Sequence, residues 1–302
     1  DPLMIALFER HVYALLGREC QPSAQIWAPL TYAGLLLSFI GIVGRRVHPA
    51  WAWGSALAIS FLLPIDSVTD QYGFAAPTLA AACFHAVAVL YLWDAWQTAP
   101  GRERVRGILL ASGMASSVCF ARNDGIALLL LDAIAWGTAP LFVYAAASGR
   151  QSSNPQAVTA NRQWMGAIYF CLFAAFLLTP WMRYRSELPI VAESTRTVIP
   201  DKVTDIDRVT FASSIQIGFW SIVAFSHFCK RSDRDDSGWY LLGSLTCSLA
   251  GLLALQYLAP SVLTTMLGEI DSQSFVPLMP IVVLFATVAA GRSNAKGNAT
   301  SP

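Results

Sequence analysis

The chain has 302 residues, of which 55% are hydrophobic and 13% are charged, and its mean hydropathy is +0.50. Because charged residues make up about a quarter of an average soluble domain, this composition excludes a soluble globular protein and predicts an integral membrane protein. The net charge of +1 leaves no surplus of cations with which to bind nucleic acid.

The first apolar stretch, residues 2–17, is interrupted by Glu9, Arg10 and His11. This pattern favours an amphipathic helix lying at the membrane interface over a further membrane span. Nine candidate spans follow in chain order, at residues 28–44, 50–64, 75–95, 107–121, 125–147, 164–182, 210–229, 238–258 and 275–291. The predicted fold is therefore all-α, a polytopic transmembrane helical bundle of about nine spans, within a range of about eight to ten.

Segment 107–121 differs from the other spans because it is short and rich in Gly, Ala and Ser. Ser112 and Ser116 are four residues apart, and so are Gly113 and Ser117. Small side chains at this spacing let a second helix approach closely. We expect this segment to lie at the centre of the bundle.

Lys and Arg are distributed unevenly between the two sides that nine alternating spans would define. Arg122 is the one cation in the short loops of one side, and five more lie in the long connection 183–209, where charge bias carries less weight. The other side carries twelve cations: Arg45, Arg46, Arg102, Arg104, Arg106, Arg150, Arg162, Lys230, Arg231, Arg234, Arg292 and Lys296. This side is predicted to be cytoplasmic.

The predicted topology divides the chain into three parts. Residues 1–26 form the interfacial helix and its lead-in, residues 27–291 form the transmembrane domain, and residues 292–302 form a disordered cytoplasmic tail. The C-terminus is then cytoplasmic, and the start of segment 28–44 is lumenal or external. We expect the protein in the endoplasmic reticulum or another endomembrane.

Ionisable residues inside the predicted spans are few, and each is a candidate functional residue because the bilayer makes it costly. Asp132 lies about 10 Å into its helix and is the deepest carboxylate of the chain. His85 lies near the middle of segment 75–95, so both side chains could face one cavity. The alternative for each is a structural hydrogen bond to a neighbouring helix. Asp94, between Trp93 and Trp96, is predicted to be an interfacial anchor.

A buried carboxylic acid that donates a proton needs apolar and aromatic walls to keep it protonated. Asp132, Asp70 and Glu269 lie at or inside helix ends and are best placed for such a role. They are the candidate catalytic residues. His85 and Trp136 are the candidate substrate-binding residues, since Trp136 follows Asp132 by four residues on the same helical face.

Other chemistries find less support in the sequence. The six cysteines show no CxxC spacing, so no metal site is predicted. Asp66 and Asp70 resemble half of a diphosphate motif, but the acidic run 233–236 falls on the opposite side of the membrane. An acyltransferase would use His85, for which the sequence shows no polar partner nearby. A transporter or a pathway scaffold is the remaining alternative.

Aromatic residues within the spans are numerous, and aromatic faces stabilise cations by up to about 2 kcal/mol in a dry environment. Aromatic walls and one protonated acid are what a proton-initiated polyene cyclisation requires. With its size, hydropathy and isolated membrane acids such as Asp132, the chain resembles the small membrane-integral terpene cyclases of fungal meroterpenoid pathways. The commonest of those cyclases have seven spans, whereas nine are predicted in this chain.

The resemblance implies a membrane enzyme of secondary metabolism, an isomerase or lyase in reaction type, that cyclises an epoxidised isoprenoid or meroterpenoid without a cofactor. No catalytic position of that family is assigned to this chain, so the site residues are chosen from their positions in this sequence alone. The expected partners are the lipid bilayer and a lipophilic small-molecule substrate. Which substrate is used, and how many copies associate, is not encoded in any motif of the chain.

Overall fold

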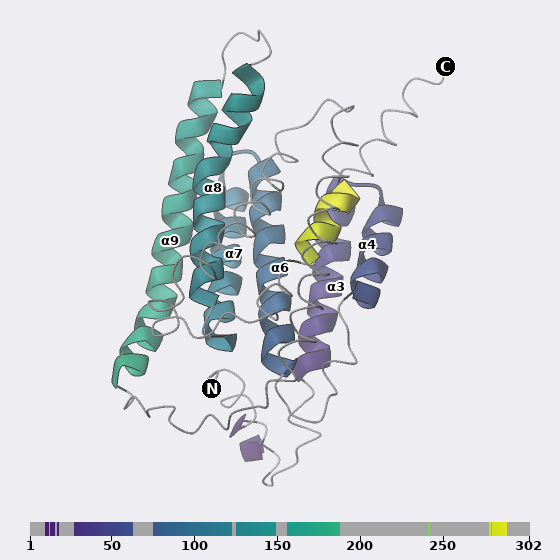
Figure 1. Ribbon diagram of the computed structural model, residues 1–302, viewed down its shortest axis with the longest axis vertical. Coiled ribbons are helices and arrows are strands. Elements are labelled where there is room, and N and C mark those ends of the chain that lie inside the picture. The colour runs from purple at the N-terminus through teal and green to yellow at the C-terminus, as the bar shows by residue number, and fades with distance from the viewer. Residues whose placement is uncertain are drawn as a thin grey trace, which may run out of the picture.

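The computed structural model describes residues 10–11, 13–15, 17, 27–62, 75–122, 125–148, 156–187, 241, 278 and 280–288. Every regular element within these ranges is a helix, as the predicted all-α class requires. The main helices are α3 (Trp27–Arg46), α4 (Pro49–Leu62), α6 (Ala75–Gln97), α7 (Arg102–Ala121), α8 (Gly125–Ser148) and α9 (Gln156–Glu187). They lie side by side along the long axis (Figure 1).

Each of the first six predicted spans coincides with one of these helices. The stretches Leu79–Gln97 and Trp164–Arg183 are long and apolar enough to cross a membrane, and Gly125–Ala139 is a shorter apolar helix. The predicted span 210–229 lies outside the described residues, and only residue 241 of span 238–258 is described. Span 275–291 contains the helix at 280–288. The full count of nine spans therefore stays a prediction.

Two helices are longer than the apolar segments that predicted them. Helix α7 starts at Arg102, five residues before segment 107–121, and α9 extends beyond both ends of segment 164–182. Hydropathy marks only the apolar part of a helix, whereas the backbone hydrogen bonds of α7 already begin at its N-cap Gly101, whose carbonyl oxygen accepts from the N–H of Val105.

Helix α7 is the centre of the described bundle, as its small residues predicted. It contacts α6, α8 and α9. Ser112 and Ser116 are buried, and Ser112 Oγ donates a hydrogen bond of 2.8 Å to the carbonyl oxygen of Phe170 in α9. On the other side of α7, a Cβ atom added to Gly107 would lie 3.3 Å from Ala95 Cβ in α6. These small residues allow close helix packing. The predicted close approach at Gly113 is wrong, because a Cβ added there has no neighbour among the described residues within 4 Å.

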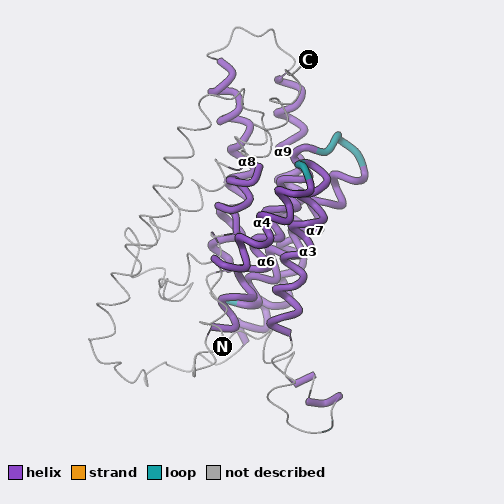
Figure 2. Tube along the Cα trace, turned by 90° about the vertical axis from the view of Figure 1, so that its right-hand side faces the viewer, coloured by secondary structure: helices purple, strands orange, loops and turns teal. Residues whose placement is uncertain are grey.

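Short connections set the directions of the helices. Only residues 98–101 separate α6 from α7, and residues 122–124 separate α7 from α8, so α6 and α8 run in the same direction. Figure 2 shows the described helices side by side in a view turned by 90°. Gly166 of α9 lies against Ile108 of α7, and Phe170 is bonded to Ser112. Helices α7 and α9 are therefore parallel.

The helix at 280–288 joins the same hydrophobic core. Its buried residues Ile281, Leu284 and Val288 are spaced by three and four positions, which places them on one helical face. Residues from much earlier in the sequence, such as Phe39 and Trp93, belong to the same core.

Candidate functional site

The two ionisable residues predicted to lie deepest in the membrane meet between α6 and α8. His85 Nε2 lies 3.3 Å from Asp132 Oδ1 and 3.2 Å from Asp132 Oδ2. Both side chains are completely buried, with 0% of their surface exposed. The imidazole edge thus faces both oxygens of the carboxylate in a contact closed to solvent.

The parallel course of α6 and α8 brings this pair together. His85 lies about 15 Å along α6 from its first residue, and Asp132 lies about 10 Å along α8, at 1.5 Å per residue. Because both helices start at the same end of the bundle, the two side chains reach similar depths. The order of the helices does not specify that the two side chains face each other. The structure shows that they do.

Apolar residues flank the pair on both helices. On α6 the buried neighbours of His85 in sequence include Ala82 and Ala86, and on α8 those of Asp132 include Leu128 and Ala135. An isolated ion in such an environment costs several kcal/mol. A neutral imidazole with a carboxylic acid, or an imidazolium with a carboxylate, has no net charge, so the pair tolerates burial better than either residue alone.

The two oxygens of Asp132 are not equivalent. The hydrogen bond with His85 involves Oδ1. Although His85 Nε2 is 3.2 Å from Oδ2, that oxygen completes no hydrogen bond among the described residues. The pair can therefore exchange a proton through Oδ1 while Oδ2 keeps capacity for a further donor or acceptor partner.

Trp136, one helical turn after Asp132, is fully buried where four helices meet. Its ring centroid lies 5.3 Å from that of Trp96 of α6 in a T-shaped contact, and Arg104 Cζ of α7 lies 5.9 Å from the Trp136 ring. On α9, a Cβ added to Gly166 would lie 3.0 Å from Trp136 Nε1. Trp136 thus lies against residues of α6, α7 and α9.

Arg104 was counted among the loop cations from its sequence, but its side chain is only 8% exposed. Its Nη2 has no hydrogen-bond partner among the described residues. Burial lowers the pKa of this guanidinium, which precedes the predicted span, because the charged form loses hydration. The helical period could have revealed it, since Arg104, Ile108 and Ala115 share one buried stripe of α7.

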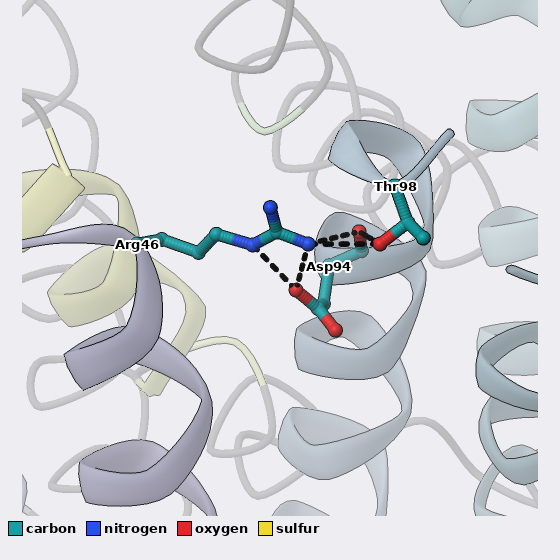
Figure 3. Close-up of polar contacts among 3 residues, drawn as sticks. All are labelled: Arg46, Asp94 and Thr98. Atoms are coloured by element: carbon teal, nitrogen blue, oxygen red, sulfur yellow. Dashed lines mark hydrogen bonds and ion pairs between the residues drawn. The ribbon is translucent and has the colours of Figure 1, made fainter. Parts of the chain in front are cut away.

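Asp94, predicted to be an interfacial anchor, bridges two helices. Arg46 Nε and Nη2 each lie 2.7 Å from Asp94 Oδ1, and Nη2 donates a 2.8 Å hydrogen bond to Thr98 Oγ1 (Figure 3). Arg46 ends α3, and Asp94 lies near the end of α6. The contact places the C-terminal ends of these helices on the same side, as the alternation of charged loops requires.

The two other candidate acids, Asp70 and Glu269, lie outside the described residues. Their approach to Asp132 stays a prediction. Within the described ranges, no group of three or more His, Cys, Asp or Glu side chains could hold a metal ion. Cys83, Cys119 and Cys171 are free thiols.

Comparisons of the chain with family models, with curated proteins and with solved structures find no match.

Proposed function

We propose that this chain is a membrane-integral terpene cyclase that acts on an epoxidised isoprenoid or meroterpenoid by general-acid catalysis. The observation that carries the proposal is the buried pair of His85 and Asp132 inside an apolar helical bundle. Buried ionisable residues in membrane helices are costly and tend to be functional. The lipophilic substrate would reach the pair from the bilayer.

Asp132 is the proposed acid. In its carboxylic form it donates its proton to the epoxide oxygen, the C–O bond breaks, and an alkene of the same chain attacks the carbon to form a ring C–C bond. The final carbocation loses a proton to a base, so the product is an isomer of the substrate. Asp70 or Glu269 is the proposed second carboxylate.

His85 orients the Asp132 carboxyl group through the hydrogen bond to Oδ1, which leaves Oδ2 available to face the substrate. Trp136 is the proposed aromatic wall that stabilises the carbocation. The guanidinium of Arg104 already lies against this ring. The ring already stabilises one cation, and because Trp136 is fully buried, a substrate cation would reach the indole only after the side chains packed around it move.

The membrane part of the proposal is a nine-span bundle in an endomembrane with a cytoplasmic C-terminus. Two described helices have the length and composition of spans. Large apolar side chains of α9, among them Leu172 and Phe176, are 64% and 71% exposed, and this is costly in water but favourable against lipid.

The experiment is to incubate microsomes that contain the full chain with farnesylated phenolic epoxides and to separate the products by chromatography with mass detection. The proposal predicts a new compound of unchanged mass that is absent from control microsomes. If well-folded protein makes no isomer from any epoxide or polyene, the cyclase is rejected in favour of a transporter or a pathway scaffold.

One observation favours acyl transfer as a second candidate. The sequence showed no polar partner for His85, and the structure supplies one in Asp132. A histidine oriented by a carboxylate is an arrangement used for general-base catalysis. The same microsomes, given a long-chain acyl-CoA and a lipophilic alcohol, would then form an ester whose mass exceeds that of the alcohol by the acyl group.

A further inference from the structure

A second candidate binding feature lies on the outer surface of the bundle, away from the buried pair. An open groove of about 660 Å³ follows the start of α7 beside α9. Its walls are almost entirely apolar, and its volume is within the range of roughly 300–1,000 Å³ that is usual for small-molecule sites. The residues that line it are Gly101, Arg102, Val105, Arg106, Leu109, Leu110 and Phe173.

The helical period gives the groove a charged end and an apolar end. Arg102 and Arg106 are one turn apart at the start of α7, so their guanidinium groups can reach the same ligand. Leu109 and Leu110 follow one turn later, and Phe173 lies in the apolar stretch Trp164–Arg183 of α9. The groove therefore passes from the cationic end of α7 onto its apolar surface.

The two arginines carry more charge than Glu103, the one acidic residue in the first turn of α7, can offset. Both are exposed, and neither has an ion-pair partner among the described residues. Arg46 at the same end of the bundle differs, because Asp94 neutralises it. Two adjacent cations beside an apolar groove are complementary to a molecule with an anionic head and a hydrocarbon chain.

We propose that this groove binds one anionic phospholipid of the surrounding bilayer. Its phosphate lies between Arg102 and Arg106, and one acyl chain follows Val105, Leu109 and Leu110 to Phe173. The aliphatic parts of the arginine side chains cover the first part of the chain, while their charged ends remain at the headgroup level. This site depends on the chain being in a bilayer and not on the proposed cyclase activity.

The headgroup half of the proposal is tested by native mass spectrometry of the full chain, purified in detergent and titrated with phosphatidylglycerol or phosphatidylcholine. We expect tighter binding of phosphatidylglycerol, and about a fivefold loss of that affinity in Arg102→Gln and in Arg106→Gln. Arg45→Gln is the matched control, because Arg45 is an exposed cation at the same end that does not line the groove.

The predicted position of the lipid acyl chain is tested with Leu110→Trp, which fills the groove. The control is Leu172→Trp, which adds the same ring at an exposed position of α9 outside the groove. We expect Leu110→Trp alone to weaken phosphatidylglycerol binding at least fivefold. Excess glycerol phosphate should not compete, because it lacks the hydrocarbon chain. Equal lipid binding by the groove variants and their controls, or full competition by glycerol phosphate, would overturn the proposal. The isomer assay is independent of these results.

Discussion

The imidazole of His85 and the carboxylate of Asp132, 3.2–3.3 Å apart, are both buried, so each lowers the cost of burying the other. If one partner is removed, the other stays buried without water and without a counterion. This lowers the free energy of unfolding by about 3–5 kcal/mol in buried pairs. Replacing both by apolar residues removes that penalty. The pair is thus a structural liability that a bundle of apolar helices does not need for its stability.

His85→Leu is therefore expected to lower the free energy of unfolding by about 3 kcal/mol, because Asp132 is left buried without its partner. The double variant His85→Leu/Asp132→Leu is expected to recover most of the loss. Chemical denaturation in detergent measures both. If the losses of unfolding free energy in the two single variants simply add up in the double variant, the coupling between His85 and Asp132 is contradicted.

Asp94 differs from Asp132 because its ion pair remains in contact with solvent. The side chains of Arg46 and Asp94 are 29% and 21% exposed. Asp94→Asn is expected to lower the free energy of unfolding by less than about 1 kcal/mol, since solvent screens such pairs. The loss should shrink when denaturation is repeated at high salt. A loss as large as that of His85→Leu would contradict this, because it would show that the ion pair of Arg46 with Asp94 is stronger than its exposure to solvent implies.

At the level of residues, the sequence identified which side chains were buried at a cost but not which of them meet. Asp132 and His85 are recognisable because ionisable residues are rare in apolar segments. Their contact depends on the rotation of α6 and α8 about their axes, which hydropathy does not report. Arg104 was missed because it lies outside the apolar limit of its span, although it continues the buried stripe of α7.

Among the elements, α9 approaches α7 and α8 closely at Gly166. A Cβ added there would lie 3.0 Å from Trp136 Nε1 and 3.2 Å from Ile108 Cδ1. Trp136 has little room to move because Trp96 and Arg104 contact its ring. The absence of a side chain at this position thus lets α9 pack against α7 and α8 together.

Gly166→Ala is expected to destabilise the bundle by about 1–3 kcal/mol, the usual cost of overpacking. Gly113→Ala is the matched control, because a Cβ at Gly113 of α7 has no neighbour within 4 Å. That change should be neutral or stabilising by up to about 1 kcal/mol through helix propensity. Thermal unfolding of the two variants side by side measures the difference, and equal melting temperatures would contradict the packing described.

The helices themselves were predictable because apolar segments of this length form helices in a membrane protein. The central place of α7 followed from Ser112 and Ser116, whose small side chains are buried in the structure. The ends of α7 and α9 were not predictable to the residue, because polar residues continue both helices beyond the apolar limit.

For the whole molecule, the ion pair of Arg46 with Asp94 and the parallel course of α7 and α9 place several cationic helix ends on one side. That this side is cytoplasmic stays a prediction of the positive-inside rule. The spans beyond α9, and with them the count of nine, rest on hydropathy, because the described part of the chain includes little of that region.

Single cysteines, placed in a chain whose six native cysteines are replaced by alanine, test this topology in sealed microsomes. Arg45→Cys and Gly101→Cys, both exposed at the cationic end, are expected to react with a membrane-impermeant maleimide added outside. Leu30→Cys, 61% exposed in the first turn of α3, is expected to react only after the vesicles are opened. Reaction of all three in sealed vesicles would contradict a membrane-spanning α3.

The central claim is that Asp132 supplies the proton for an isomerisation inside the bundle. The most direct measurement compares isomer formation from a farnesylated phenolic epoxide by wild type, Asp132→Asn and Asp94→Asn at equal amounts of folded protein. Asp94→Asn is the control, because it makes the same carboxylate-to-amide change on α6, the helix that carries His85, but outside the buried pair. We expect only Asp132→Asn to lose the isomer, by at least about a hundredfold. Full turnover by Asp132→Asn would contradict the claim and leave the pair with His85 a structural one.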